Sequence, residues 1–119
     1  MKAKIYFCIT TSNREIFLDP NLKLGFLDRY RNIEINNVYS ISSPEDEIDF
    51  DDIGEAIFDY CRKFDIPDVK DFRKDLTAYI QVIPIIEVES DLRVYLDAGL
   101  LDILGKKGFG IDIHAQSPI

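Results

Sequence analysis

The apolar positions of this sequence form two kinds of pattern, one typical of β-strands and one typical of α-helices. The strand pattern combines β-branched and aromatic side chains with short-range alternation. We expect four strands from it, at residues 3–11, 33–41, 77–88 and 108–115. Residues 33–41 also fit a tight hairpin that turns at Asn36-Asn37. Pro84 lies inside the third run and cannot donate a ladder hydrogen bond, so it predicts a sheet edge or a bulge there.

Helical spacing of apolar residues appears in three further segments, at about 20–31, 50–66 and 91–104. Asp19 followed by Pro20 begins the first of them, and the serine-, proline- and acid-rich loop 42–49 leads into the second. Asp49 or Asp51 is expected to cap this second helix, which ends before Pro67. The apolar stripe of the second helix comprises Ile53, Ile57, Tyr60, Cys61 and Phe64.

The third helix is expected to begin at a Ser90 cap and to end at Gly105. Residues 68–76 add a helical turn or two between the second helix and the third strand. The side chains expected to face inward from the third helix are Leu92, Tyr95, Leu96, Leu100, Ile103 and Leu104.

This order of elements predicts a single α/β (α+β) domain over residues 1–119, a sandwich in which three helices pack on a mixed sheet of about four strands. The chain of 119 residues is long enough to bury a core. We find no internal repeat, low-complexity tract or long linker in it.

The net charge of −8 comes from one segment of the chain. The sequence holds 22 acidic and 14 basic residues, and eight of the acids lie between residues 45 and 59, which we call the acidic stretch. Outside it the acids and bases are equal in number, at 14 each. A patch of one sign attracts a partner of opposite charge and repels nucleic acid and anionic lipid.

The acidic stretch is therefore the candidate binding surface, and no base lies within it. Phe50 inside an acidic rim would serve as an apolar anchor. The expected partner-binding residues are Asp46, Glu47, Asp49, Phe50, Asp51, Asp52, Glu55 and Asp59. The plain alternative is a solvated loop and helix face that keeps the protein soluble.

Other sequence features argue against cofactors and membranes. No run of apolar residues approaches the ~18 that a membrane span needs. The N-terminal run lacks a small-residue cleavage site, so we expect a cytoplasmic protein. Cys8 and Cys61 are far apart in the sequence and are expected to be buried small hydrophobes. We expect no cofactor.

Three short motifs point to chemistry that the rest of the sequence does not support. Residues 49–54 resemble the start of a calcium loop, but Ile53 and Tyr60 occupy its fifth and twelfth places, so an EF-hand is rejected and only loose divalent binding remains open. Gly105 and Gly108 match the GxxG loop of KH domains, without the helix that must follow it. His114 near Asp112 could form a general base, but no nucleophile accompanies it.

The C-terminal third carries a resemblance to a known class of proteins. Residues 84–88 (PIIEV), a capped helix and residues 108–113 (GFGIDI) are similar to a bacterial domain family of unknown function, whose last helix leads into a G-x-x-IDI strand. Residues 18–20 (LDP) before a helix also fit that family. With its small size and acidity, the chain resembles bacterial immunity proteins of toxin–immunity pairs, such as those of contact-dependent growth inhibition.

This resemblance implies a non-enzymatic inhibitor of a cognate toxin, commonly a nuclease with a basic surface. Two alternatives stay open. One is a small enzyme that uses carboxylates and His114, with or without a divalent metal. The other is an acidic docking subunit of a larger assembly. The sequence leaves open whether the protein is a monomer or a homodimer.

Overall fold

A computed structural model describes residues 1–13, 15, 31–35, 38–64, 66–72, 74–86 and 92–117. Residues 20–30 of the expected first helix, the Asn36-Asn37 turn and the Ser90 cap fall outside these residues, and Arg31, expected at the end of that helix, begins a strand instead. The described elements are β1 (Lys2–Thr11), β2 (Arg31–Ile35), β3 (Val38–Ser42), β4 (Asp46–Asp49), α2 (Ile53–Lys63), the 3₁₀ turn η3 (Lys70–Phe72), β5 (Thr77–Ile85), α3 (Ala98–Lys107) and β6 (Gly110–Ile113).

The six described strands form one mixed sheet in the order β2-β3-β1-β5-β6. β4 also pairs with β1, alongside residues 2–5, whereas β3 pairs with residues 8–11. All pairs are antiparallel except β5 with β6, which is parallel. The expected α+β class and mixed sheet are therefore confirmed, but the sheet has six strands rather than about four.

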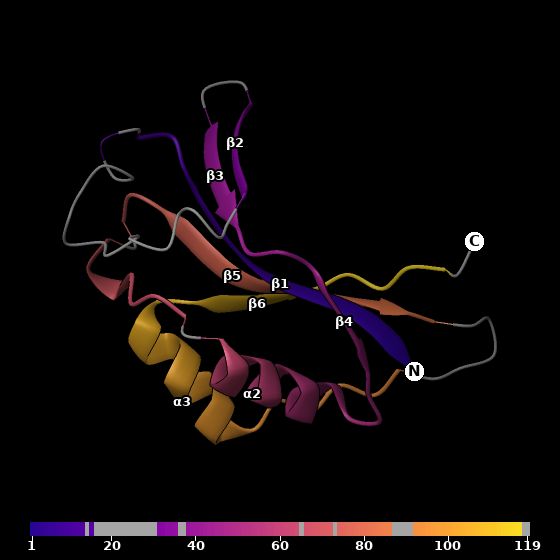
Figure 1. The fold of residues 1–119 in the computed structure, drawn as a ribbon. Helices are drawn as coiled ribbons and strands as arrows, with labels where there is room; N and C mark the ends of the chain where they lie inside the picture. The colour runs from indigo at the N-terminus through magenta and orange to yellow at the C-terminus, as the bar shows by residue number, and fades with distance from the viewer. Residues whose placement is uncertain are drawn as a thin grey trace.

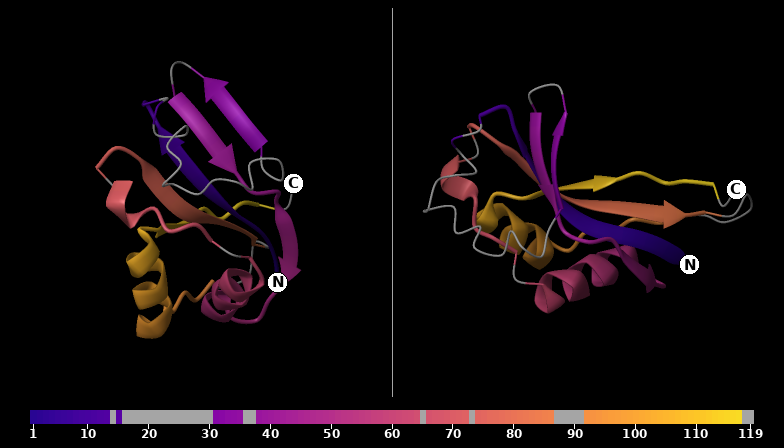
Figure 2. Two further views of the ribbon diagram at one scale, coloured as in Figure 1. Left: turned by 60° about the vertical axis from the view of Figure 1, so that its left-hand side comes forward. Right: turned by 45° about the horizontal axis from the view of Figure 1, so that its top comes forward.

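α2 and α3 lie on the same face of the sheet (Figure 1), and two further views show the same arrangement (Figure 2). Alternate residues of the two central strands point toward the helices and are buried, as strand geometry requires. The helices contribute Ile53, Ile57, Tyr60, Leu100 and Leu104 to this core. The strands contribute Ala3, Ile5, Phe7, Ile9, Ile41, Ala78, Ile80 and Val82.

The segment expected as a loop at 42–49 contains a strand. Ile48 lies opposite Ala3 of β1 and packs against the core, although acids and Pro44 give this segment a low strand propensity. Backbone pairing with β1 outweighs that propensity. The expected hairpin within residues 33–41 is confirmed as β2 paired with β3, with Ile35 opposite Val38.

Pro84 lies neither at a sheet edge nor in a bulge. The pairing of β1 with β5 runs without interruption from Lys2 opposite Ile85 to Thr10 opposite Thr77, and Ala3 faces Pro84. The Pro84 carbonyl accepts a hydrogen bond from the Gln116 amide, 2.9 Å away. The N–H and carbonyl of a strand residue point to the same side, so the proline nitrogen faces the segment after β6 and costs β1 no hydrogen bond.

The helix boundaries differ from those expected, because other side chains cap them. Asp52, not Asp49 or Asp51, caps α2 by accepting from the Glu55 amide at 3.0 Å. Asp97 caps α3, with its carboxylate 2.9 Å from the Gly99 amide, so this helix begins seven residues later than expected. It also continues past Gly105 to Gly108, whose φ of 82° ends it.

Two residues expected to face inward from α3 are exposed. Tyr95 lies before the helix, with 68% of its surface exposed, and Ile103 is 40% exposed. Leu100 and Leu104 are buried as expected, and Leu92 and Leu96 pack at the edge of the core. None of the helices in the described residues is long and apolar enough to cross a membrane.

Candidate functional site

The acids of the acidic stretch belong to two different elements of the fold. Three of its acids (Asp46, Glu47 and Asp49) belong to β4, and four others (Asp51, Asp52, Glu55 and Asp59) lie at the start of α2 or on it. Phe50, between the two groups, is buried and belongs to the core. The expectation that Phe50 is an exposed anchor is therefore wrong.

The acids of β4 have basic neighbours from distant parts of the chain. Asp46 forms a salt bridge with Lys63 of α2, with 3.3 Å between Nζ and the carboxylate oxygen. Glu47 and Asp49 lie opposite Lys4 and Lys2 in the register with β1. Charged side chains directly opposite each other on one face of a sheet are close enough to interact. Asp46 is therefore paired, and Glu47 and Asp49 each have a lysine across the strand pair without a salt bridge to it in the described residues.

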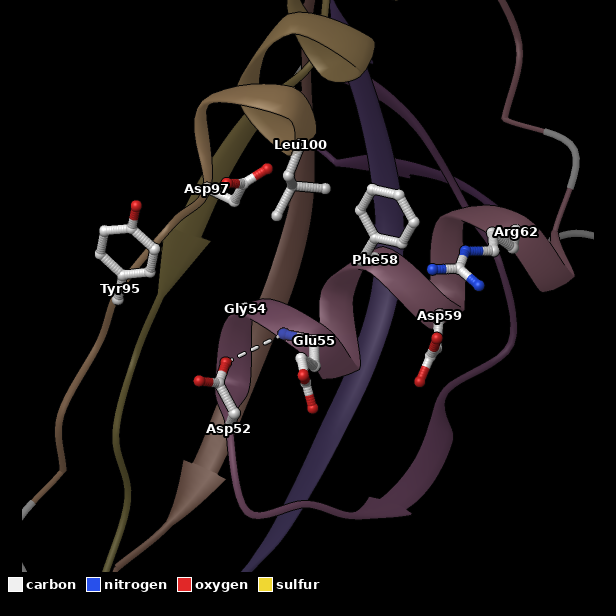
Figure 3. A pocket seen from close by; sticks show the side chains of 9 residues that line it. All are labelled: Asp52, Gly54, Glu55, Phe58, Asp59, Arg62, Tyr95, Asp97 and Leu100. Atoms are coloured by element: carbon white, nitrogen blue, oxygen red, sulfur yellow. Dashed lines mark hydrogen bonds between the residues drawn. The ribbon is translucent and has the colours of Figure 1, made fainter.

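Three acids of α2, Asp52, Glu55 and Asp59, line a groove, and Asp51 does not. This groove has a volume of about 580 Å³ and lies between α2 and the segment that leads into α3. Figure 3 shows Phe58 and Arg62 projecting from α2 and Tyr95 coming from the segment before α3. We call it the acidic groove; its lining residues are Asp52, Gly54, Glu55, Phe58, Asp59, Arg62, Tyr95, Asp97 and Leu100.

Helical geometry places four of these residues together. Glu55, Phe58, Asp59 and Arg62 are spaced three or four residues apart, so they form one stripe beside the buried stripe of α2. The sequence pattern already places Glu55, Asp59 and Arg62 outside the apolar stripe, and the structure adds Phe58 to them.

A glycine lets the two sides of the acidic groove approach each other. Gly54 is buried in the first turn of α2, and a Cβ there would collide with the carbonyl oxygen of Tyr95. The missing side chain therefore allows the chain before α3 to pack directly against α2. This close packing places Tyr95 at the edge of the acidic groove, where the Tyr95 side chain is exposed.

The carboxylates of the acidic groove differ in their availability. In Asp52 and in Asp97, one carboxylate oxygen already accepts a capping hydrogen bond from a backbone amide. Glu55 and Asp59 are exposed, and neither forms an ion pair with any residue that the structure describes. Phe58 lies between them along the chain and is half-buried. These two carboxylates are therefore free to meet basic groups of a partner.

Among the residues that the structure describes, Arg62 is the one base that lines the acidic groove, and its guanidinium lies over an aromatic ring. The Arg62 guanidinium carbon lies 4.2 Å from the centroid of the Phe58 ring. This distance is within the range of a cation–π interaction. The ring of Phe58 therefore already contacts a guanidinium in the free protein.

Sequence reasoning missed Phe58, Arg62, Tyr95 and Asp97 as site residues. Tyr95 was expected in the core because the third helix was placed too early. The signal for Asp97 was its position two residues before Gly99, at the start of an apolar helical repeat.

The other residues considered for catalysis or metal binding do not form a site within the described structure. His114 and Asp112 are both exposed, and no hydrogen bond joins their side chains in the described structure. Within the described ranges, no three His, Cys, Asp or Glu side chains lie close enough to hold a metal ion. Cys8 is buried, and Cys61 is half-buried at the edge of the core, where burial raises the pKa of its thiol to about 11.

Comparisons cover protein-family models, curated proteins and solved structures. None of the three finds a match for this chain. The interpretation of the site therefore rests on its geometry and charge.

Proposed function

We propose that this protein is a non-enzymatic immunity protein, which binds and neutralises a bacterial toxin domain through the acidic groove. The observation that supports this most is that Glu55 and Asp59, which form no ion pair with the described residues, lie beside Phe58 in a concave surface. Aromatic side chains surrounded by charge are common anchors of protein interfaces. The resemblance of the chain to immunity proteins supplies the class of partner.

A basic toxin domain fits this surface electrostatically. A nuclease presents lysine and arginine side chains that hold the phosphates of its substrate. Carboxylates that contact the same side chains would exclude that substrate. Such an interface forms rapidly, and salt slows its association.

The test is co-expression with the protein encoded by the neighbouring reading frame, scored as rescue of growth. We expect wild-type protein to rescue growth and the double variant Glu55→Lys/Asp59→Lys to fail. The matched control is Asp71→Lys/Asp75→Lys, which changes the net charge equally at two exposed residues outside the acidic groove. This control should rescue growth as the wild type does.

Two other results would contradict the proposal. Rescue by both double variants would show that the acidic groove is not the interface. A neighbouring protein that is not toxic, but that co-purifies through the acidic groove, would favour a docking subunit instead of an immunity protein.

A further inference from the structure

The contact of Arg62 with Phe58 indicates which basic group the acidic groove accepts. The guanidinium lies over the ring at 4.2 Å, and Arg62 makes no ion pair with any residue in the described ranges. Its neighbours one turn and two turns earlier on α2 are Phe58 and Glu55. The ring and the nearby carboxylates together offer a flat face and charged acceptors to a planar cation.

Arginine fits such an arrangement better than lysine does. Its guanidinium is planar, stacks on aromatic rings and donates hydrogen bonds in a fixed fork, whereas the lysine ammonium is compact and strongly hydrated. Glu55 and Asp59 are the free acceptors beside Phe58. The exposed ring of Tyr95 is a second aromatic surface in the same groove.

We infer that the acidic groove binds an arginine side chain of the partner protein, which stacks on Phe58 in place of Arg62. In the free protein the Arg62 guanidinium occupies the face of the Phe58 ring, and the partner's arginine displaces it. This inference rests on the proposed function in taking the acidic groove as the docking surface, but it names the recognised group.

The inference can be tested without the natural partner. The probe is an acetylated, amidated peptide with the sequence GSRGRSG, compared with the same peptide carrying lysine at both arginine positions. Each is titrated into the ¹⁵N-labelled full-length protein, and amide shifts are followed by NMR. We expect the arginine peptide to shift signals of α2 and of residues 95–100, and to bind about two- to fivefold more tightly than the lysine peptide.

Two variants separate stacking from simple charge. Arg62→Ala should tighten binding of the arginine peptide by about two- to fivefold, because the resident guanidinium is removed. Lys63→Ala makes the same change in net charge, but Lys63 pairs with Asp46 outside the acidic groove, so this variant should have the smaller effect. Phe58→Leu should abolish the preference for arginine over lysine while its circular dichroism stays that of the wild type.

Several outcomes would overturn the inference. They are equal affinity for the two peptides, no binding of either at millimolar concentration, shifts confined to residues outside the acidic groove, and an Arg62→Ala effect no larger than that of Lys63→Ala. A failure of the arginine inference can be distinguished from a failure of the proposed immunity function. Growth rescue that depends on Glu55 and Asp59 can persist without any arginine preference, and the peptide can bind where no toxin exists.

Discussion

The Tyr60 hydroxyl of α2 lies 2.9 Å from the Ser43 hydroxyl oxygen, and both residues are buried between helix and sheet. The same Ser43 oxygen accepts a hydrogen bond from the Phe7 amide at 3.0 Å. The Ser43 amide in turn donates to the Phe7 carbonyl, also at 3.0 Å. One serine therefore joins α2, β1 and the connection between β3 and β4, and so fixes the orientation of α2 on the sheet.

We expect Ser43→Ala to lower the free energy of unfolding by about 1–3 kcal/mol, because the buried Phe7 amide loses this acceptor. Urea denaturation followed by circular dichroism measures the change. Ser42→Ala is the matched control, since no side-chain hydrogen bond of Ser42 is found in the described structure, and it should change stability by less than about 0.5 kcal/mol. A cost of Ser43→Ala below about 0.5 kcal/mol, no larger than that of the control, would show that the Ser43 hydroxyl adds nothing measurable to stability.

Two glycines of the α3 region should respond to alanine with opposite signs. Gly108 has a φ of 82°, and a Cβ there would lie 2.8 Å from the Cα of Lys70. Gly105 lies within the helix, and a Cβ there would meet nothing within 4 Å. Gly108→Ala should therefore destabilise the protein by at least about 1 kcal/mol, and Gly105→Ala should stabilise it by about 0.5–1 kcal/mol.

Thermal unfolding of both variants checks this pair. If Gly105 were the residue that ends the helix, as the sequence suggested, Gly105→Ala would be the destabilising substitution. That result would contradict the helix end described here.

The sequence predicted well the elements that depend on local pattern. The strands at β1, β5 and β6 and the buried stripe of α2 follow from residue spacing within a few turns or pleats. It did not predict β4, because that strand exists through pairing with β1, more than forty residues away. The helix caps were also misplaced. Near the start of α2, Asp49, Asp51 and Asp52 are equivalent candidates until the chain is folded, and α3 is capped by Asp97 rather than by the expected Ser90.

The same reason explains the error in the candidate site. The acidic stretch looked uncompensated, because Lys2, Lys4 and Lys63 come next to the acids of β4 only in the folded protein. On α2, Glu55 and Asp59 form no ion pair with the described residues, and Asp52 caps the helix. The sequence therefore identified the charged segment, and folding decides which of its acids meet a lysine and which line the acidic groove.

Phe50 and Phe58 should behave in opposite ways when replaced by alanine. Phe50 is 8% exposed, and its backbone pairs with that of Met1, with the Phe50 amide 2.8 Å from the Met1 carbonyl oxygen. Phe50→Ala should cost about 3–5 kcal/mol of stability, as expected for a core phenylalanine. Phe58→Ala should cost clearly less, because its ring is half-buried in the acidic groove, but it should weaken growth rescue.

Denaturation curves and the growth assay together check both variants. A large loss of stability in Phe58→Ala would mean that its ring serves the fold rather than the surface. Rescue by Phe58→Ala at the wild-type level would remove this ring from the interface.

The Cys61 thiol should react slowly in the folded protein. Burial raises its pKa from 9.0 to about 11, and the positive charge of Lys107 opposes this only in part. A raised thiol pKa means that the folded protein keeps the proton at a pH where the unfolded chain releases it, so at pH 8 the thiolate fraction falls about 100-fold.

Alkylation of Cys61 by iodoacetamide should therefore be about 100-fold slower in the folded protein than in guanidinium chloride, and should accelerate as the pH rises toward about 11. Peptide mapping by mass spectrometry separates the label on Cys61 from any on Cys8. If folded and unfolded protein react at equal rates at pH 8, burial does not hold the thiol protonated, and the edge of the core opens at Cys61.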